Sequence, residues 1–312
     1  MSEIGTPDPL GATTHVDSAE GAPLTVAVQR GELSQFVGFT RSSKGFAIGL
    51  VIVSISVFLW AFGPLVVPHQ PLTEDFKAIL AAPSGSHWFG TDQNGRDVFS
   101  RVLAAPRTDI YIAVVSTLIA MALGIPLGVL ATGTSRVGEL LGEWLLRLMD
   151  VLQAFPVFIL GLALVAAFGP TAVNVIIALT VLQFPVFLRL TRSAALSVRG
   201  RTFVEAARIG GAGTFGVMFR HVLPNSIAPA LVGASVAVAQ AVLITAGLSF
   251  VGAGIRPPTP EWGQMISDGA QNLITGQWWP SVFPGIALGV VVLGYALLGD
   301  GLRLYLDPAR RR

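Results

Sequence analysis

Long runs without charged residues constrain this chain more than any other feature. Several runs of about 20 residues contain no Asp, Glu, Lys or Arg, and a helix of about 20 residues crosses ~30 Å of hydrocarbon. Such a helix satisfies its own backbone hydrogen bonds where no water is present. The sequence therefore predicts an all-α, polytopic membrane protein with six transmembrane helices, at about 46–67, 110–133, 144–168, 171–190, 226–252 and 282–299.

The composition agrees with this class and excludes several chemistries. Charged residues make up 12% of the chain and hydrophobic residues 52%, whereas soluble domains carry roughly 25% charged residues. The formal net charge of +2 is too small to indicate nucleic-acid binding. Because the sequence contains no Cys, disulfides, thiolate metal sites and cysteine nucleophiles are excluded. Residues 1–40 are polar and lack the apolar core of a cleavable signal peptide.

The distribution of Lys and Arg predicts the orientation. If the N-terminus lies inside, 15 of the 20 basic residues fall on the inner side and 5 on the outer side. Cytoplasmic loops carry an excess of Lys and Arg. We therefore expect both termini in the cytoplasm, together with the loop 191–225.

The segments outside the spans predict the remaining organisation. Residues 1–30 are rich in Gly, Pro, Thr, Asp and Glu, which is typical of a disordered tail. Residues 31–45 can form an amphipathic elbow on the inner membrane surface. An external segment follows at 68–109, a core with five spans occupies 110–303, and residues 304–312 form a cytoplasmic C-terminus.

Residues 202–224, TFVEAARIGGAGTFGVMFRHVLP, predict two short helices between two spans. Thr202 and Glu205 have the spacing of a capping box, with Thr202 at the N-cap and Glu205 reaching back to its amide. Gly210-Gly211 can end the first helix, since Gly readily takes the left-handed C-cap conformation. Pro224 can open the next span, where Pro is tolerated in the first turn.

A soluble-looking loop held between spans indicates a docking surface for a partner. Ala206 and Ala207 are good helix formers without bulk, so a partner surface can approach them closely. The alternative is that Glu205 only caps its own helix. Capping and docking are compatible roles.

The external segment contains the run GTDQNGRD, which predicts a turn followed by a helix. Its polar and turn-forming residues are Asp92, Asn94, Gly95, Arg96 and Asp97. Asn-Gly favours a turn, and we expect the helix to start at Arg96. The run is similar to part of a calcium loop, but its glycine and glutamate are misplaced for one.

No catalytic or metal site is predicted. A phosphate-binding loop ends in Gly-Lys-Ser/Thr, and neither Lys44 nor Lys77 has that context. No Ser-His-Asp set can be assembled. The four histidines lie in the tail and loops without metal-ligand spacing: His15, His69, His87 and His221.

Polar residues within the predicted spans allow two interpretations. Gln153, Gln183 and Gln240 could line a passage or could join helices by hydrogen bonds. Arg147 and Asp150 lie about one turn apart and are expected to pair. Gly at 124 and 128, and again at 285 and 289, permits close helix packing.

The loop motif resembles the EAA loop of bacterial ABC importer permeases, on which the ATPase subunit sits. The matching positions are Glu205, Ala206, Ala207, Gly211, Leu223 and Pro224. His221 stands where the general pattern has Ile, but FRHVLPN resembles the peptide-type variant. Four further stretches resemble the OppC/DppC permeases: HWFGTDQNGRDVFSRVLAAPRTD, RLMDVLQAFPVFIL, LSFVGAGIRPPTPEWGQMISDG and LLGDGLRLYLDP. The tail to about residue 27 lies outside this resemblance.

The resemblance implies a MetI-like permease of the bacterial cytoplasmic membrane, without catalytic activity of its own. Expected partners are an OppB/DppB-type permease, two ABC ATPase subunits that bind ATP and Mg²⁺, an external substrate-binding protein, membrane lipid and a peptide substrate. No cofactor is expected in this chain. The alternatives are a nickel or other small-solute ABC permease and, from another class, an ion-gradient-driven secondary transporter. Intramembrane carboxylates usually mark ion routes, and the predicted spans carry none near their centres.

Overall fold

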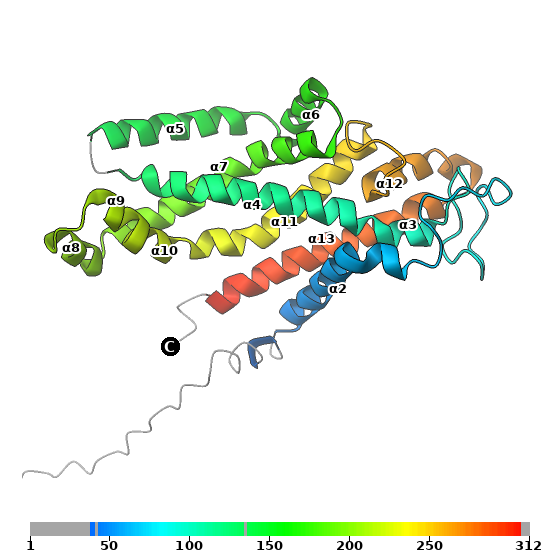
Figure 1. The fold of residues 1–312 in the computed structure, drawn as a ribbon, viewed down its shortest axis with the longest axis horizontal. Helices are drawn as coiled ribbons and strands as arrows, with labels where there is room; N and C mark the ends of the chain where they lie inside the picture. The colour runs from blue at the N-terminus through cyan, green and yellow to red at the C-terminus, as the bar shows by residue number, and fades with distance from the viewer. Residues whose placement is uncertain (1–37, 41–42, 134–135, 307–312) are drawn as a thin grey trace, which may run out of the picture. The chain divides into compact units, whose positions relative to one another are not determined.

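The computed structural model describes residues 38–40, 43–133 and 136–306. The chain divides into the units Met1–Gly38 and Phe39–Arg312. The second unit is built from helices joined by loops (Figure 1). In chain order they are α2 (Lys44–Val66), α3 (Val98–Ala104), α4 (Pro106–Leu130), α5 (Arg136–Ala154), α6 (Val157–Phe168), α7 (Ala172–Arg199), α8 (Thr202–Ile209), α9 (Thr214–Gly216), the π-helix η1 (Val217–Val222), α10 (Leu223–Ser226), α11 (Ala228–Phe250), α12 (Trp262–Ala270), the 3₁₀-helix η2 (Leu273–Thr275) and α13 (Trp279–Leu306).

Five of the described helical segments are long and apolar enough to cross a membrane. They are Lys44–Val66, Val98–Leu130, Ala172–Arg199, Ala228–Phe250 and Trp279–Leu306, and the bent pair α5–α6 makes six if it is one span. Large apolar side chains on their surfaces are exposed, as in Leu65 (80%) and Val173 (64%). This exposure suits lipid or a partner subunit and does not suit water.

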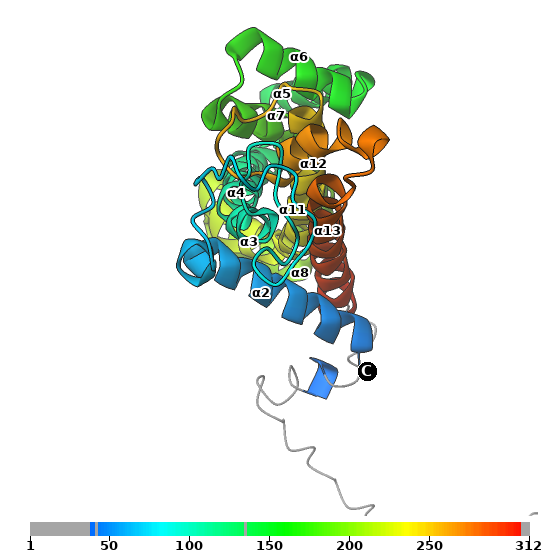
Figure 2. The ribbon, with the colours of Figure 1, turned by 90° about the vertical axis from the view of Figure 1, so that its right-hand side faces the viewer.

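Helices α4, α7 and α11 form the centre of the unit. Helix α4 packs along α7 and α11, while α13 contacts α11, α12 and α2. Figures 1 and 2 show α5 and α6 at one edge and α2 at the opposite edge. The main core cluster includes Ile112, Leu179, Leu248 and Trp262, all buried.

Two glycines let α4 and α7 approach closely. A Cβ at Gly124 would lie 2.9 Å from the Cβ of Phe187, and one at Gly128 would lie 2.6 Å from the carbonyl oxygen of Leu188. The expected close packing at 124 and 128 is therefore confirmed. The same expectation is wrong for Gly285 and Gly289. A Cβ at Gly285 would only reach a side-chain atom 4.0 Å away, and one at Gly289 would meet nothing within 4 Å.

The predicted third span is not one straight helix. Its two parts, Gly142–Ala154 and Val157–Phe168, meet at an angle of 92°. Pro156 precedes α6, and a proline restricts the residue before it to non-helical conformations.

The predicted pair of Arg147 with Asp150 is wrong. Asp150 forms an ion pair with Arg189 of α7. The guanidinium of Arg147 lies 5.4 Å from the centre of the Trp144 ring.

Several helix boundaries differ from the predicted ones. Helix α7 continues to Arg199, beyond the expected end at 190, and α13 continues to Leu306. Helix α4 starts at Pro106, so the predicted external segment 68–109 ends within a helix. Of the predicted elbow 31–45, residues 38–40 are helical and Lys44 begins α2, while 31–37 and 41–42 lie outside the described residues. The predicted tail 1–30 lies outside them as well.

The two loop regions singled out by the sequence lie at opposite ends of the helices. Helix α8 stands at one end of the unit, and α3 and α12 stand at the other (Figure 1). Helix α4 connects the two ends with 25 residues, or about 37 Å at 1.5 Å per residue.

Candidate functional site

Residues 202–224, called the EAA segment below, form a folded cap on one end of the bundle. Val204 of α8 is buried and packs in an apolar cluster with Val129, Val198 and Val222. These partners come from α4, α7 and η1, so three elements hold α8 in place. Burying an aliphatic side chain of this size contributes about 1.5–3 kcal/mol.

The predicted C-cap of α8 is confirmed. Gly211 has a φ of +84°. Its N–H donates to the carbonyl of Arg208 (3.0 Å), and the N–H of Ala212 donates to the carbonyl of Ala207 (3.1 Å). These two bonds define a Schellman motif, which satisfies carbonyls at the helix end. Gly211 therefore determines how the chain leaves α8.

The predicted capping box is wrong. Thr202 is the first residue of α8 and Arg201 is the N-cap, with no side-chain capping bond. Within the described residues, the Glu205 carboxylate forms no hydrogen bond or ion pair, and the residue is exposed. Because no internal role holds this carboxylate, it is available to a partner.

The outer face of the EAA segment is unusually apolar for a loop. Ile209 is 88% exposed and Phe215 is 70% exposed. The ring of Phe215 stacks on that of Phe219 with centroids 6.2 Å apart. Ala206 is exposed and Ala207 is partly exposed. Large exposed apolar side chains grouped with polar neighbours mark protein interaction sites.

The other two predicted docking residues lie at the far end of the segment. Leu223 is partly buried and packs against the same apolar cluster, and Pro224 is exposed. Pro224 lies in the first turn of the short helix α10 rather than in the next span, which begins at Ala228 with Pro229 in its first turn. The expectation that Pro224 opens the span is therefore wrong, because the short helix α10 precedes the span.

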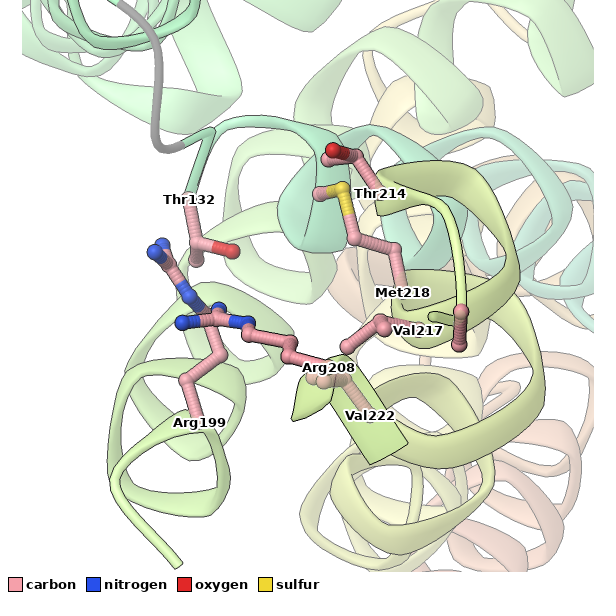
Figure 3. Close-up of a pocket in the computed structure, with 8 residues that line it drawn as sticks. Thr132, Arg199, Arg208, Thr214, Val217, Met218 and Val222 are labelled. Atoms are coloured by element: carbon pink, nitrogen blue, oxygen red, sulfur yellow. The ribbon is translucent and has the colours of Figure 1, made fainter. Parts of the chain in front are cut away.

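A pocket of about 210 Å³ adjoins α8 (Figure 3). Its lining residues are Thr132, Arg199, Arg208, Ala212, Thr214, Val217, Met218 and Val222. In Figure 3 the guanidinium groups of Arg199 and Arg208 lie near each other. Neither forms an ion pair with a described residue. Glu139 and Glu143 line an adjoining pocket together with Arg199 and Arg208, so carboxylates of this chain lie near both cations.

The three glutamines of the predicted spans have different surroundings. Gln183 is buried on α7, where its Oε1 accepts from Thr117 Oγ1 of α4 (2.8 Å) and its Nε2 lies 3.5 Å from Ser116 Oγ. Gln183 thus joins two helices. Gln153 and Gln240 are exposed on α5 and α11. Their assignment to a passage stays a prediction.

The turn at the opposite end is ordered by two aspartates. Asp92 Oδ1 accepts from the backbone N–H groups of Asn94 (2.8 Å) and Arg96 (2.9 Å), and Gly95 has a φ of +72°. Asp97 caps α3 by accepting from Ser100 N (2.8 Å). The predicted turn is confirmed, but the helix starts at Val98 rather than at Arg96.

Long-range contacts fix this end of the unit. Arg96 pairs with Glu74, and the buried Arg101 lies 3.6 Å from Asp92. Trp279 Nε1 donates to the carbonyl of Thr91 (3.1 Å). The first two contacts lie within the 68–109 segment and the third joins it to α13, so the segment is an ordered part of the fold.

Sequence reasoning missed two clusters at this end. The first is a buried pair of carboxyl groups. Asp109 accepts from the backbone N–H of Trp262 (3.1 Å), and Glu261 caps α12 by accepting from Gly263 N and Gln264 N (2.9 and 2.6 Å). Burial raises the pKa of Glu261 above the usual range of a glutamate, although these two backbone donors oppose the change.

The second cluster contains two of the histidines that were expected to lie apart. The rings of His69 and His87 are 4.9 Å apart between centroids, so the expectation of scattered histidines is wrong for this pair. Their separation of 18 positions in the chain gave no sign of the contact.

Apolar helices of spanning length, an exposed helical face at one end and an ordered loop region at the other are typical of a multi-pass helical permease. Residues 124–312 match the family described as binding-protein-dependent transport system inner membrane component. The chain belongs to this family, whose members are membrane subunits of ABC importers and carry no ATPase activity. It is a multi-pass protein of the bacterial inner membrane. The family implies further permease, ATPase and binding-protein components.

Curated relatives match along most of the chain. The probable D,D-dipeptide transport system permease protein DdpC of Escherichia coli (strain K12) is 38% identical over 88% of this chain and 91% of its own length. The di/tripeptide transport system permease protein DppC of Pseudomonas aeruginosa (strain UCBPP-PA14) is 39% identical over 88% of this chain and 92% of its own.

Solved structures support the fold. The inward-facing MetNI methionine ABC transporter contains a chain that is 19% identical to this one. That chain superposes with a TM-score of 0.53 over 66% of this chain and 97% of its own length. A chain of an amino acid ABC transporter with histidines reaches a TM-score of 0.51 at 15% identity, covering 69% of this chain and 95% of its own. The MetI-like permease fold is thereby confirmed.

Proposed function

We propose that this chain is a channel-forming subunit of an ATP-driven importer that moves di- or oligopeptides across the cytoplasmic membrane. The relatives that match over most of the chain are named as dipeptide and di/tripeptide permeases. A second permease of the OppB/DppB type completes the passage, and two ABC ATPase subunits and an external binding protein complete the importer.

The exposed face of the EAA segment is the observation that carries this proposal. A permease without a phosphate-binding loop needs a surface that transmits motion from a separate ATPase. Glu205, Ile209 and Phe215 are exposed on that face, while Val204 anchors the same helix in the core. A rigid helix end of this kind can transmit a displacement into α4 and α7.

The remaining assignments follow from the same scheme. The 15-to-5 distribution of basic residues supports a cytoplasmic position for both termini and the EAA segment. ATP and Mg²⁺ bind to the partner subunits, and this chain holds no cofactor. Gln240 and Gln153, which are exposed, are the residues proposed to face the passage or the partner permease, whereas Gln183 serves helix packing.

Two alternatives differ in cargo or driving force. A nickel or small-solute importer would share the fold and the EAA segment, but the relatives compared above are named for peptides. A secondary transporter would need ionisable groups along the passage. Asp109 lies in the first turn of α4 rather than at its centre, so the carboxyl pair gives that class little support.

Uptake into reconstituted vesicles tests the proposal. The vesicles contain this chain with its second permease, ATPases and binding protein. A labelled dipeptide should accumulate only with ATP, and a catalytically inactive ATPase should abolish the signal. Accumulation of Ni²⁺ without dipeptide would support the small-solute alternative. Uptake driven by a proton gradient without ATP would contradict the whole scheme.

A further inference from the structure

Three potential ligands for a metal ion meet at the end of the bundle away from the EAA segment. They are His69, His87 and Asp97, and one possible ligand atom from each lies within 4.8 Å of the other two. His69 comes from the loop after α2, His87 from the loop before α3, and Asp97 is the N-cap of α3. The cluster thus joins three separate stretches of the 68–109 segment.

The carboxylate of Asp97 is held in a fixed orientation. Its Oδ2 accepts from Ser100 N (2.8 Å) and from Ser100 Oγ (2.6 Å), and the side chain is 3% exposed. The other oxygen, Oδ1, lies 2.9 Å from His87 Nδ1. An oriented, buried carboxylate loses little freedom when it binds an ion, which favours binding.

The two imidazoles converge on that carboxylate. Nδ1 of His69 lies 3.8 Å from Asp97 Oδ2, and the backbone N–H of His69 donates to Ser100 Oγ (3.1 Å). The same serine therefore orients both the carboxylate and the residue that carries the second imidazole. The His69 side chain is 45% exposed and that of His87 18% exposed.

These separations suit a small divalent ion. Zinc binds His nitrogen and carboxylate oxygen at about 2.0–2.2 Å in tetrahedral geometry, which places neighbouring ligand atoms about 3.3–3.6 Å apart. The imidazoles approach different oxygens of Asp97, with His87 Nδ1 2.9 Å from Oδ1 and His69 Nδ1 3.8 Å from Oδ2. One oxygen of Asp97 can serve both imidazoles after a rotation of the His69 side chain, which is 45% exposed and has room to move.

We propose that His69, His87 and Asp97 form a binding site for a divalent transition-metal ion, with Zn²⁺ as the preferred ion. Two imidazoles and one carboxylate suit zinc, nickel and copper, and they suit Mg²⁺ and Ca²⁺ poorly. The bound ion replaces the hydrogen bond between His87 and Asp97 and fastens the loop after α2 to the start of α3. The site is independent of the transported substrate and of the ATPase.

A structural pairing without metal is the competing explanation. In that case His87 donates a hydrogen bond to Asp97, and the His69 ring only packs against the His87 ring. The two explanations differ at His69, because its ring makes no short hydrogen bond to Asp97 at 3.8 Å. Removing the His69 ring should abolish metal binding but leave the pairing of His87 with Asp97 intact.

The test uses the full-length permease, purified in detergent with an affinity tag free of histidine. Zn²⁺ is titrated calorimetrically, and Co²⁺ is used as a spectroscopic probe whose visible absorption reports tetrahedral ligands. We expect one high-affinity ion per chain. His69→Ala and His87→Ala should each weaken binding at least tenfold and remove the tetrahedral Co²⁺ spectrum.

The matched control is His221→Ala, which removes a histidine from the EAA segment and should leave binding unchanged. Thermal unfolding provides the second measurement. Zn²⁺ should raise the Tm of the wild type and of His221→Ala, because a ligand of the folded state stabilises it, and it should leave the Tm of folded His69→Ala unchanged. Absence of Zn²⁺ binding in the wild type, or equal binding by His69→Ala, would overturn the proposal.

Discussion

At the residue scale, Gly211 offers the sharpest test of the EAA segment. Its φ of +84° is a conformation that costs ordinary residues roughly 1–2 kcal/mol and β-branched residues more. Gly211→Val should therefore unwind the end of α8 and displace Ala212 at the pocket, while the permease still inserts. We expect ATP-driven uptake to be lost, as measured in the reconstituted vesicles.

Gly213 supplies the matched control, since its φ is −64° and an added Cβ meets nothing within 4 Å. Gly213→Val should keep most of the uptake, and Gly211→Asn should lie between the two because Asn tolerates positive φ. Full uptake by a stably inserted Gly211→Val variant would refute the proposed transmission through this segment.

Glu261 leads to a prediction about pH. Burial raises its pKa, so the folded state keeps a proton to a higher pH than the unfolded chain does. The stabilising contribution is complete below the unfolded pKa of about 4.3 and is lost as pH rises through the folded pKa, with a slope of at most about 1.4 kcal/mol per pH unit. The Tm of the wild type in detergent should fall across that interval.

Glu261→Gln should flatten this dependence, because an amide cannot ionise while its oxygen can still accept from a backbone N–H. The exposed carboxylate of Glu205 provides the control, and Glu205→Gln should retain the slope of the wild type. If Glu261→Gln and the wild type lose Tm in parallel with rising pH, another group controls the effect.

At the element scale, the outward face of α8 and α9 should provide the apolar part of the ATPase contact. Ile209 is 88% exposed, and burying an Ile side chain contributes about 1.5–3 kcal/mol. Ile209→Asp should weaken ATPase binding by roughly 10- to 100-fold, as measured by titrating the ATPase onto the detergent-solubilised permease pair.

A second isoleucine makes the comparison specific. Ile274 of η2 is 95% exposed but lies at the opposite end of the unit, so Ile274→Asp should leave ATPase affinity unchanged. Equal losses in both variants would mean that added charge, rather than this face, disturbs the complex.

The sequence predicts the long helices well and their interruptions poorly. Apolar runs mark α2, α4, α7, α11 and α13 because each needs about 20 residues to cross a bilayer. The 92° bend between α5 and α6 was missed because the run from 144 to 168 has a spanning length whether it is straight or bent. The capping box failed for a different reason: its spacing is local, whereas the start of α8 is set by the packing of Val204 against Val129 and Val198.

At the candidate sites too, the sequence predicts local motifs but not the clusters that form between separate elements. The Schellman end at Gly211 and the turn at Asn94-Gly95 depend on a few neighbouring residues, and both were predicted. The contact between His69 and His87, the pair of Asp109 with Glu261, and the pocket between Arg199 and Arg208 join residues from separate elements. No spacing in one sequence marks those contacts, so they required the fold.

At the scale of the whole molecule, orientation is the assumption that connects the EAA segment to a cytoplasmic ATPase. The helices alone could insert with either end inside, but the predicted topology assigns 15 of the 20 Lys and Arg residues to the side of the EAA segment. Reporter fusions should place Gly211 and Arg312 in the cytoplasm, and Ser86 and Gln271 outside. Gly211 follows α8 and Gln271 follows α12. These two helices lie at opposite ends of the unit (Figure 1), which agrees with opposite sides of the membrane for the two positions.

Cysteine accessibility provides an independent measurement, because the chain contains no Cys of its own. Single substitutions Ser86→Cys and Gly213→Cys occupy exposed loop positions at the two ends. A membrane-impermeant maleimide added to intact spheroplasts should label Ser86→Cys and spare Gly213→Cys, and opening the membrane should make both reactive. Labelling of Gly213→Cys in sealed spheroplasts would place the EAA segment outside. The ATPase could not then reach Glu205 or Ile209, and the proposed import mechanism would fail at its first step.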